Sequence, residues 1–263
     1  MKELGNFYAA ANRLTGTLPP ELGSLSSLRV LFLYENSLHG PLPDEYAQLT
    51  NLEDLIIHTN RLTGTVPLDI GFNLNRMRAM FLQGNAFTGS LDTNFMRESD
   101  IETFDITNNQ LTGQLPAGLF EARNLQTLAL SINCFTGSLP PSMCSMSKAV
   151  VISLDGLGAA PSCSGTVEFP ITKIKLFNTL EGTIPLCVWD LPNLTLFHVA
   201  GVRHLGCCLA ASTPPSYSSI ISSLLLSLSN LTRRIVVFYH LICCLNCRMA
   251  SRERYRKFRL PHN

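Results

Sequence analysis

An asparagine returns at nearly constant intervals through the first half of this 263-residue chain. Six of them are separated by 24, 24, 25, 24 and 24 residues, and they are Asn12, Asn36, Asn60, Asn85, Asn109 and Asn133. A glycine lies four residues after each one, and a proline lies seven residues after five of the six. A fixed period of this length is typical of a solenoid, in which each repeat forms one coil that stacks on the next.

Each coil also carries a short apolar alternation. Leu31 and Leu33, for example, precede Asn36 by five and three residues, and the same positions are apolar before the next four asparagines. This two-residue period predicts a short strand whose apolar side chains face the interior while their neighbours face outward. Another apolar residue, such as Leu28, lies eight residues before the asparagine. We expect it to enter the core from a helical or 3₁₀ segment.

The asparagines have a structural explanation in hydrogen bonding. An amide side chain both donates and accepts hydrogen bonds, so one asparagine can serve the turn of its own coil and the backbone of the adjacent coil. The loss of such a buried partner costs roughly 1 to 3 kcal/mol. Asn178, which begins the segment "NTLEGTIP", is a seventh candidate for this structural ladder.

The repeated pattern "NxLTGxLPxxLxxLxxLxxLxLxx" resembles the plant-specific class of leucine-rich repeat. This class occurs in receptor-like kinases, receptor-like proteins and polygalacturonase-inhibiting proteins. The resemblance covers residues 1–145 and resumes over 178–201. It implies an α/β solenoid, a right-handed superhelix with a parallel β-sheet on its concave face and a second set of short strands from the "LTGxLP" segments. It also implies binding of a protein, peptide or glycan and no catalysis.

The pattern becomes irregular after Cys144. Asn133 and Asn178 are 45 residues apart, three short of two repeats, and this interval contains the apolar pairs Ile152/Leu154 and Ile174/Leu176. We interpret each pair as a strand. The prediction is therefore a solenoid over 1–206 of about nine coils, regular over 1–145 and degenerate over 146–206, with the last three coils irregular.

Residues 207–263 contain no repeat. Their apolar run from 235 to 247 is shorter than the roughly 20 residues that cross a bilayer, yet a cluster of arginines and a lysine follows it, as in a short anchor with a cytoplasmic flank. Three interpretations remain open: a membrane anchor within 217–259, a packed C-terminal cap helix, or a mistranslated or disordered tail.

All nine cysteines lie at or after Cys134, and Cys134 and Cys144 could form a bridge within one coil in an oxidising compartment. Two Asn-x-Thr sequons predict N-glycosylation at Asn193 and Asn230 and favour a secretory route. No apolar signal segment follows the start of the chain. The resemblance implies the plasma membrane or the extracellular space, and the cytoplasm is the alternative.

Composition and motifs argue against several other classes of function. A net charge of +1 gives no basic face for nucleic acid. The chain has no glycine-rich phosphate loop, nucleophile elbow or His-Glu-x-x-His motif, and its six histidines lack metal-ligand spacing. Cys244 and Cys247 have C-x-x-C spacing without a second pair. We therefore expect no enzyme activity, no cofactor and no metal.

The outward strand positions are free to be selected for a partner, and aromatic residues gather there in the first four coils. We predict a ligand-binding set on the concave face that consists of Tyr8, Phe32, Tyr34, Glu35, Asp54, His58, Phe81, Gln83 and Asp105. Its rings would form one stripe with an acidic rim, and exposed aromatic clusters are enriched at protein interfaces. The expected partner is a basic or amphipathic polypeptide, or a glycan stacked on the rings.

The leading prediction is a non-enzymatic recognition module, such as the sensor part of a receptor-like protein. The alternatives are a secreted inhibitor of a cell-wall hydrolase and a structural or adhesion protein without a dedicated ligand. The paired-cysteine caps that the resemblance implies are missing from both ends, so the first coil is expected to expose Leu4, Phe7 and Leu14. The oligomeric state stays open.

Overall fold

The protein is described by a computed structural model that covers residues 3–154, 163, 178–199 and 202–205. All of these except Leu205 belong to one compact unit, residues 1–204. The predicted tail at 207–263 lies outside the described residues, and so does the possible anchor at 217–259. No helix in the described ranges is both long enough and apolar enough to cross a bilayer.

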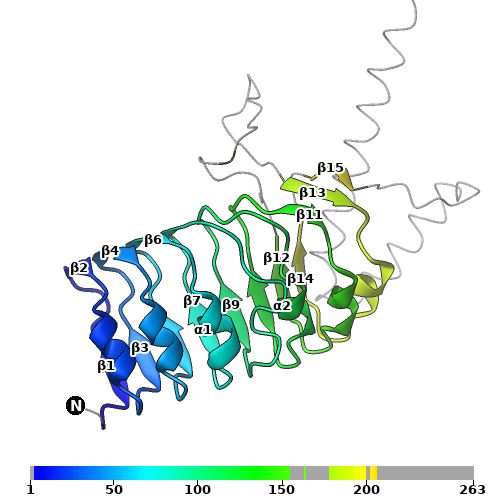
Figure 1. Cartoon of the computed structure of the whole chain (residues 1–263). Coiled ribbons are helices and arrows are strands. Elements are labelled where there is room, and N and C mark those ends of the chain that lie inside the picture. Colours follow the sequence, from blue (N-terminus) through cyan, green and yellow to red (C-terminus); the bar gives the residue numbers. More distant parts are fainter. Residues whose placement is uncertain (1–2, 155–162, 164–177, 200–201, 206–263) are drawn as a thin grey trace, which may run out of the picture. The chain divides into compact units, whose positions relative to one another are not determined.

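Short parallel strands, one from each coil, form an eight-stranded main sheet (Figure 1). In sheet order they are β1 (Asn6–Tyr8), β3 (Val30–Phe32), β5 (Asp54–Ile56), β7 (Ala79–Phe81), β9 (Thr103–Asp105), β10 (Thr127–Ala129), β12 (Val151–Ser153) and β14 (Leu196–His198). From β3 onward the central residue of each strand is buried and its two neighbours are partly exposed. This pattern confirms the predicted period of two.

The segments after the asparagines form further parallel strands, as the resemblance implied. A four-stranded sheet contains β2 (Thr15–Thr17), β4 (Ser37–Pro41), β6 (Arg61–Gly64) and β8 (Ala86–Phe87), and a three-stranded sheet contains β11 (Thr136–Ser138), β13 (Asn178–Gly182) and β15 (Val202–Leu205). The glycine four residues after each asparagine from Asn12 to Asn133 has a positive φ. At Gly40 this angle is +80°, and a Cβ there would lie 2.9 Å from Thr17 Cγ2. The glycine is therefore required by both conformation and space.

Short helical segments return the chain to the main sheet. They are the 3₁₀ turns η1 (Pro20–Ser24), η2 (Asp44–Gln48), η3 (Pro141–Ser145) and η4 (Leu186–Asp190) and the helices α1 (Leu68–Asn73) and α2 (Ala117–Glu121). A proline occupies the N-cap position of all six. Proline fixes φ and lacks an N–H, so it suits this site, where the strand ends and the helical turn begins. Asp92 replaces it in the fourth coil and accepts a hydrogen bond from Asn94 N at 2.8 Å.

The core is a column of leucine, isoleucine, methionine and phenylalanine side chains that runs through the stacked coils. Leu28, Leu31 and Leu33 show how one coil contributes, since each is at most 3% exposed. Each such burial contributes about 1.5 to 3 kcal/mol relative to exposure. Leu4 and Phe7 also pack partly against this core. The expectation that they would be exposed is wrong, and only Leu14, at 41% exposed, fits it.

The asparagines connect neighbouring coils through their side chains. Asn60 Nδ2 donates to Ile57 O of its own coil at 3.1 Å and to Leu33 O of the preceding coil at 3.0 Å. Its Oδ1 accepts from Leu38 N of the preceding coil at 3.1 Å. The corresponding contacts recur at the four other asparagines from Asn36 to Asn133. These hydrogen bonds pair backbone N–H and C=O groups that the turns would otherwise leave without partners.

The coil count differs from the prediction. In the described residues β12 pairs directly with β14, with Val151 opposite Leu196, so the main sheet has eight strands where about nine coils were expected. The predicted strand residues Ile174 and Leu176 lie outside the described residues, and the pairing leaves no place for them between β12 and β14. Between Asn133 and Asn178 the described residues therefore contribute one strand, β12, to the main sheet. Asn178 keeps the ladder register, because Gly137 faces Leu180 as Gly40 faces Leu62.

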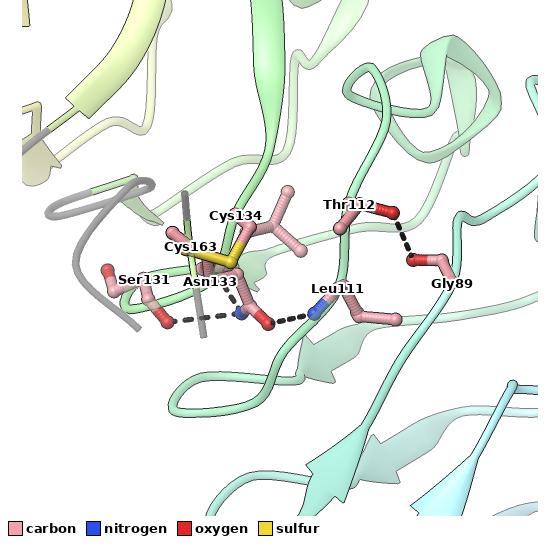
Figure 2. Close-up of a disulfide and its surroundings, with 8 residues drawn as sticks. Gly89, Leu111, Thr112, Ser131, Asn133, Cys134 and Cys163 are labelled. Carbon is pink, nitrogen blue, oxygen red and sulfur yellow. Dashed lines mark hydrogen bonds between the residues drawn. A yellow bond between two sulfur atoms is a disulfide. The ribbon is translucent and has the colours of Figure 1, made fainter. Parts of the chain in front are cut away.

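Two disulfides link Cys134 to Cys163 and Cys144 to Cys187, each with a Cα–Cα distance of 5.4 Å. The hypothesis of a Cys134–Cys144 bridge is therefore wrong. Cys134 follows Asn133 in the turn after the sheet, whereas Cys144 lies in η3, so the two belong to different sides of the coil. Figure 2 shows the first disulfide beside Asn133, whose Oδ1 accepts from Leu111 N at 3.1 Å.

Candidate functional site

The side of the main sheet that faces away from the core carries three rows of side chains, which we call the open face. Row one is Asn6, Val30, Asp54, Ala79, Thr103, Thr127, Val151 and Leu196, and row two is Tyr8, Phe32, Ile56, Phe81, Asp105, Ala129, Ser153 and His198. Row three follows two residues later and is Ala10, Tyr34, His58, Gln83, Thr107 and Ser131. Strand pairing places the members of each row next to one another, about 4.8 Å apart.

Four rings on the first three coils are in contact and form a ring cluster of Tyr8, Phe32, Tyr34 and His58. The Tyr8 and Phe32 centroids are 5.2 Å apart in an edge arrangement, and those of Phe32 and Tyr34 are 6.1 Å apart. Tyr34 and His58 stack at 4.7 Å with 15° between their planes. Such contacts contribute about 0.5 to 1.5 kcal/mol each beyond burial. The cluster is therefore a preorganised surface with few free rotamers.

Phe81 does not continue this cluster. Ile56 lies between Phe32 and Phe81 in row two, and Phe81 makes no ring contact with any described residue. The structure thus joins four of the five predicted rings and adds an aliphatic side chain that sequence reasoning did not select. Its outward position in the strand alternation was the available signal. Row two is consequently apolar without interruption from Tyr8, which is 63% exposed, to Phe81.

Carboxylates lie close to this apolar row. Asp105 is paired in register with Phe81, and its Oδ1 accepts a hydrogen bond from Thr107 N at 2.9 Å. Asp54 begins the strand that carries Ile56, and within the described residues its carboxylate has no hydrogen bond or ion pair. Burial, followed by the neighbouring Glu53, raises the pKa of Asp54. A cation brought by a partner would relieve this unfavourable environment.

His58 and Glu35 occupy the end of the ring cluster. Burial lowers the pKa of His58, while Glu35 and Asp105 oppose that effect. Its Nδ1 lies 3.0 Å from Thr59 Oγ1. Glu35 is exposed and has a φ of 53° in the turn before Asn36. The lowered pKa favours the neutral imidazole that stacks on Tyr34.

Gln83 follows His58 in row three and contains a buried oxygen, Oε1, that has no hydrogen-bond partner among the described residues. A buried acceptor without a donor is unfavourable by about 1 to 3 kcal/mol. Gln83 therefore brings a polar amide to row three of the open face, next to His58.

The open face has a different character over its C-terminal strands. On β10 the rows contain Thr127 and Ala129, and the hydroxyl of Ser131 in row three lies 2.8 Å from that of Ser153 on β12. These side chains are small, and Val151, Leu196 and His198 complete the rows on β12 and β14. The predicted ligand-binding residues all lie on or next to β1 to β9, so the candidate site occupies one end of the face. Across the described ranges, no group of three or more His, Cys, Asp and Glu residues could hold a metal ion.

Comparisons with known proteins agree with this architecture. The family described as Leucine Rich Repeat matches residues 124–146. The ectodomain of the plant membrane receptor kinase GASSHO1/SCHENGEN3 from Arabidopsis thaliana, in complex with CASPARIAN STRIP INTEGRITY FACTOR 2, matches with a TM-score of 0.64 and 26% identity over 76% of this chain. The chain is a plant-type leucine-rich-repeat protein.

Other solved leucine-rich-repeat structures match over a similar extent. The plant peptide hormone receptor RGFR1 in complex with RGF2 has a TM-score of 0.59 and 25% identity over 77% of this chain, and PEPR1–AtPEP1 has 0.57 and 26% over 77%. This leucine-rich-repeat chain spans 21%, 32% and 29% of the lengths of the GASSHO1/SCHENGEN3, RGFR1 and PEPR1 chains. The comparison with curated proteins found no match.

Proposed function

We propose that the chain is a non-enzymatic recognition module whose open face binds an extended peptide with apolar and basic side chains. The observation that carries the proposal is the ring cluster together with the apolar row from Tyr8 through Ile56 to Phe81, beside the unpaired carboxylate of Asp54. The similarity to receptor ectodomains solved with CASPARIAN STRIP INTEGRITY FACTOR 2 and with RGF2 supports it.

The dimensions of the face suit a short extended segment. Four neighbouring strands span about 14 Å from the first to the last, which corresponds to four or five residues of extended chain. Apolar side chains of the ligand would cover Phe32, Ile56 and Phe81. Exclusion of water from such rings supplies most of the affinity at peptide and protein interfaces.

The acidic groups would determine which peptides bind. A lysine or arginine of the ligand would pair with Asp54 or Asp105, and the Gln83 oxygen would accept a hydrogen bond from it or from the ligand backbone. Charge complementarity contributes more to selectivity and association rate than to affinity. Acidic peptides of the same length should consequently be rejected.

The test uses an array of ten-residue synthetic peptides that combine leucine or phenylalanine with lysine or arginine, and a second array in which glutamate replaces the basic residues. The full chain is compared with Phe32→Ala/Tyr34→Ala and with Thr127→Ala, a control on the uncharged end of the same face. The double variant should lose about tenfold or more in affinity for the basic array, and Thr127→Ala should bind like the unaltered chain. Equal binding by the folded double variant, with folding checked by circular dichroism, would exclude this site.

Inhibition of a cell-wall hydrolase and adhesion without a dedicated ligand remain predictions. A glycan ligand has a specific point in its favour, because the strongly exposed ring of Tyr8 offers a stacking surface. Binding of uncharged oligosaccharides that is lost in Tyr8→Ala, together with no capture of basic peptides, would replace the peptide proposal with this one.

A further inference from the structure

Asn193 is an exposed asparagine in a turn immediately before β14, and it begins the sequon Asn193-Leu194-Thr195. It lies three residues before the row-one residue Leu196, so it is outside the three rows of the open face. Asn51 and Asn124 occupy the corresponding positions before β5 and β10, three residues before Asp54 and Thr127. Both are only half-exposed, and neither has a serine or threonine two residues later.

The contacts of Asn193 leave its side chain available for modification. Its Nδ2 donates one hydrogen bond, to Ser147 O of the preceding coil at 2.8 Å. Asn51 makes the equivalent bond to Ser26 O at 2.8 Å, whereas Asn124 Nδ2 donates to Asp100 Oδ1 at 3.2 Å. A primary amide nitrogen has two hydrogens, and one remains when the other is replaced by a sugar. The coil can keep its hydrogen bond after glycosylation.

The cysteines provide an independent observation about the compartment. Every cysteine in the described ranges, namely Cys134, Cys144, Cys163 and Cys187, is part of a disulfide. Disulfides of this structural kind form and persist in the secretory route and outside the cell, and they are rare in the cytosol. The same route carries out glycosylation of Asn-x-Ser/Thr sequons. The disulfide from η3 to η4 lies in the same two coils as Asn193.

We propose that the chain matures in the secretory route and carries an N-linked glycan on Asn193. In this transfer a bond forms between Nδ2 and the anomeric carbon of a lipid-diphosphate-linked oligosaccharide. The bond from that carbon to the diphosphate oxygen breaks, and the lipid diphosphate leaves while Nδ2 releases one proton. The glycan covers the coil edge before β14 and leaves the ring cluster on the open face free. This proposal does not depend on peptide recognition.

The experiment expresses the full chain behind a secretory leader in eukaryotic cells, with Asn230→Gln in every sample so that Asn193 lies in the one remaining sequon. Peptide:N-glycosidase should convert Asn193 to aspartate, which mass spectrometry of the tryptic peptide detects. Thr195→Ser keeps the sequon and should retain the glycan. Thr195→Ala and Asn193→Gln should each lose it and migrate with the mass of the enzyme-treated protein.

A secreted chain whose Asn193 peptide is found unmodified would overturn the proposal. Retention of an enzyme-sensitive mass in Asn193→Gln would overturn it as well, because the glycan would then lie elsewhere. The same samples, alkylated without reduction, should yield crosslinked peptides for Cys134–Cys163 and Cys144–Cys187. Free thiols at these four positions would contradict the secretory part.

Discussion

The regular coils up to Cys144 and the irregular coils after it are held together in different ways. In the regular part, asparagine side chains bridge each pair of coils, and the chain has no cysteine before Cys134. In the irregular part, residues 154–177 separate β12 from β13 along the chain, and two disulfides are present. Backbone hydrogen bonds connect the coils in both parts, and disulfides are added where the repeat becomes irregular.

A disulfide and a ladder asparagine contribute free energies of the same order to the stability of the fold. The disulfides close intervals of 29 and 43 residues, and the chain-entropy treatment assigns about 3.5 to 4 kcal/mol to loops of this size. A buried asparagine that serves several backbone groups is worth roughly 1 to 3 kcal/mol for the groups left unpaired on its removal. One disulfide thus corresponds in magnitude to about one to four ladder asparagines.

The largest expected effect comes from the irregular part. Cys144→Ser/Cys187→Ser should destabilise the C-terminal coils by about 4 kcal/mol. Hydrogen exchange should show lost protection in β14 with unchanged protection in β5, because coils contact only their neighbours. A uniform loss of protection across both strands would mean that the regular and irregular coils unfold as one unit. The two parts would then not differ in how they are stabilised.

The ladder can be broken in the regular part. Asn109 is 3% exposed, and its amide contacts Phe87 N, Leu82 O and Ile106 O. Asn109→Ala should lower the free energy of unfolding by about 3 kcal/mol, since several buried groups lose partners. Asn12→Ala is the matched control. The Asn12 side chain is exposed, and among the described residues it bonds only to Ala9 O and Ala10 O of its own coil, so urea titration should show a loss below about 1 kcal/mol. Equal losses would contradict the ladder's role.

Close packing on the helical side should be sensitive to a single methyl group. A Cβ on Gly23 would lie 2.4 Å from the backbone oxygen of Glu45 in the next coil. Gly23→Ala should therefore destabilise by about 2 kcal/mol through overpacking. Gly16→Ala introduces a Cβ with nothing within 4 Å, and its cost, from a φ of +92° alone, should be smaller. Thermal unfolding of both variants measures the difference.

At the boundary between the two parts, Ile132 has a φ of 54° and is 37% exposed. Left-handed backbone is unfavourable for β-branched residues, whereas asparagine tolerates it, and Asn108 occupies this position one coil earlier with φ 57°. Ile132→Asn should stabilise the protein by about 1 kcal/mol. A lower unfolding midpoint would show that the isoleucine side chain contributes packing that outweighs its strain.

The smallest effect concerns pH. Because the pKa of Asp54 is raised on folding, its ionised form opposes folding above that pKa, and this opposition disappears as the group becomes protonated. Asp54→Asn should consequently raise the unfolding midpoint slightly at pH 7 and leave it unchanged at pH 3. Thr127→Asn replaces a neutral residue of the same row, on β10, and its effect on the unfolding midpoint should not depend on pH. If Asp54→Asn and the unaltered chain had equal unfolding midpoints at pH 7, burial would not be raising the pKa of Asp54.

The candidate site was only partly predictable. The outward positions followed from the alternation around residues such as Leu31 and Leu55, so Phe32 and Ile56 could both be placed on the open face. The contacts between rings depend on the directions of the side chains and on the position of Ile56 between Phe32 and Phe81. The alternation of residues in the sequence does not contain that information. The environments of Asp54 and Gln83 likewise depend on neighbours in adjacent coils, which are about two dozen residues away.

The amino-acid sequence by itself determined the period, the parallel strands and the interior column, because each coil repeats the same local hydrogen-bonding and burial requirements. Only the tertiary structure decided the disulfide partners and the eight-stranded count. Cys134 and Cys144 are close along the chain but lie on different sides of a coil, and β12 pairs directly with β14 although the apolar alternation at 174–176 lies between them in the sequence. Stacking of coils, which sets these distances, is a property of the folded chain.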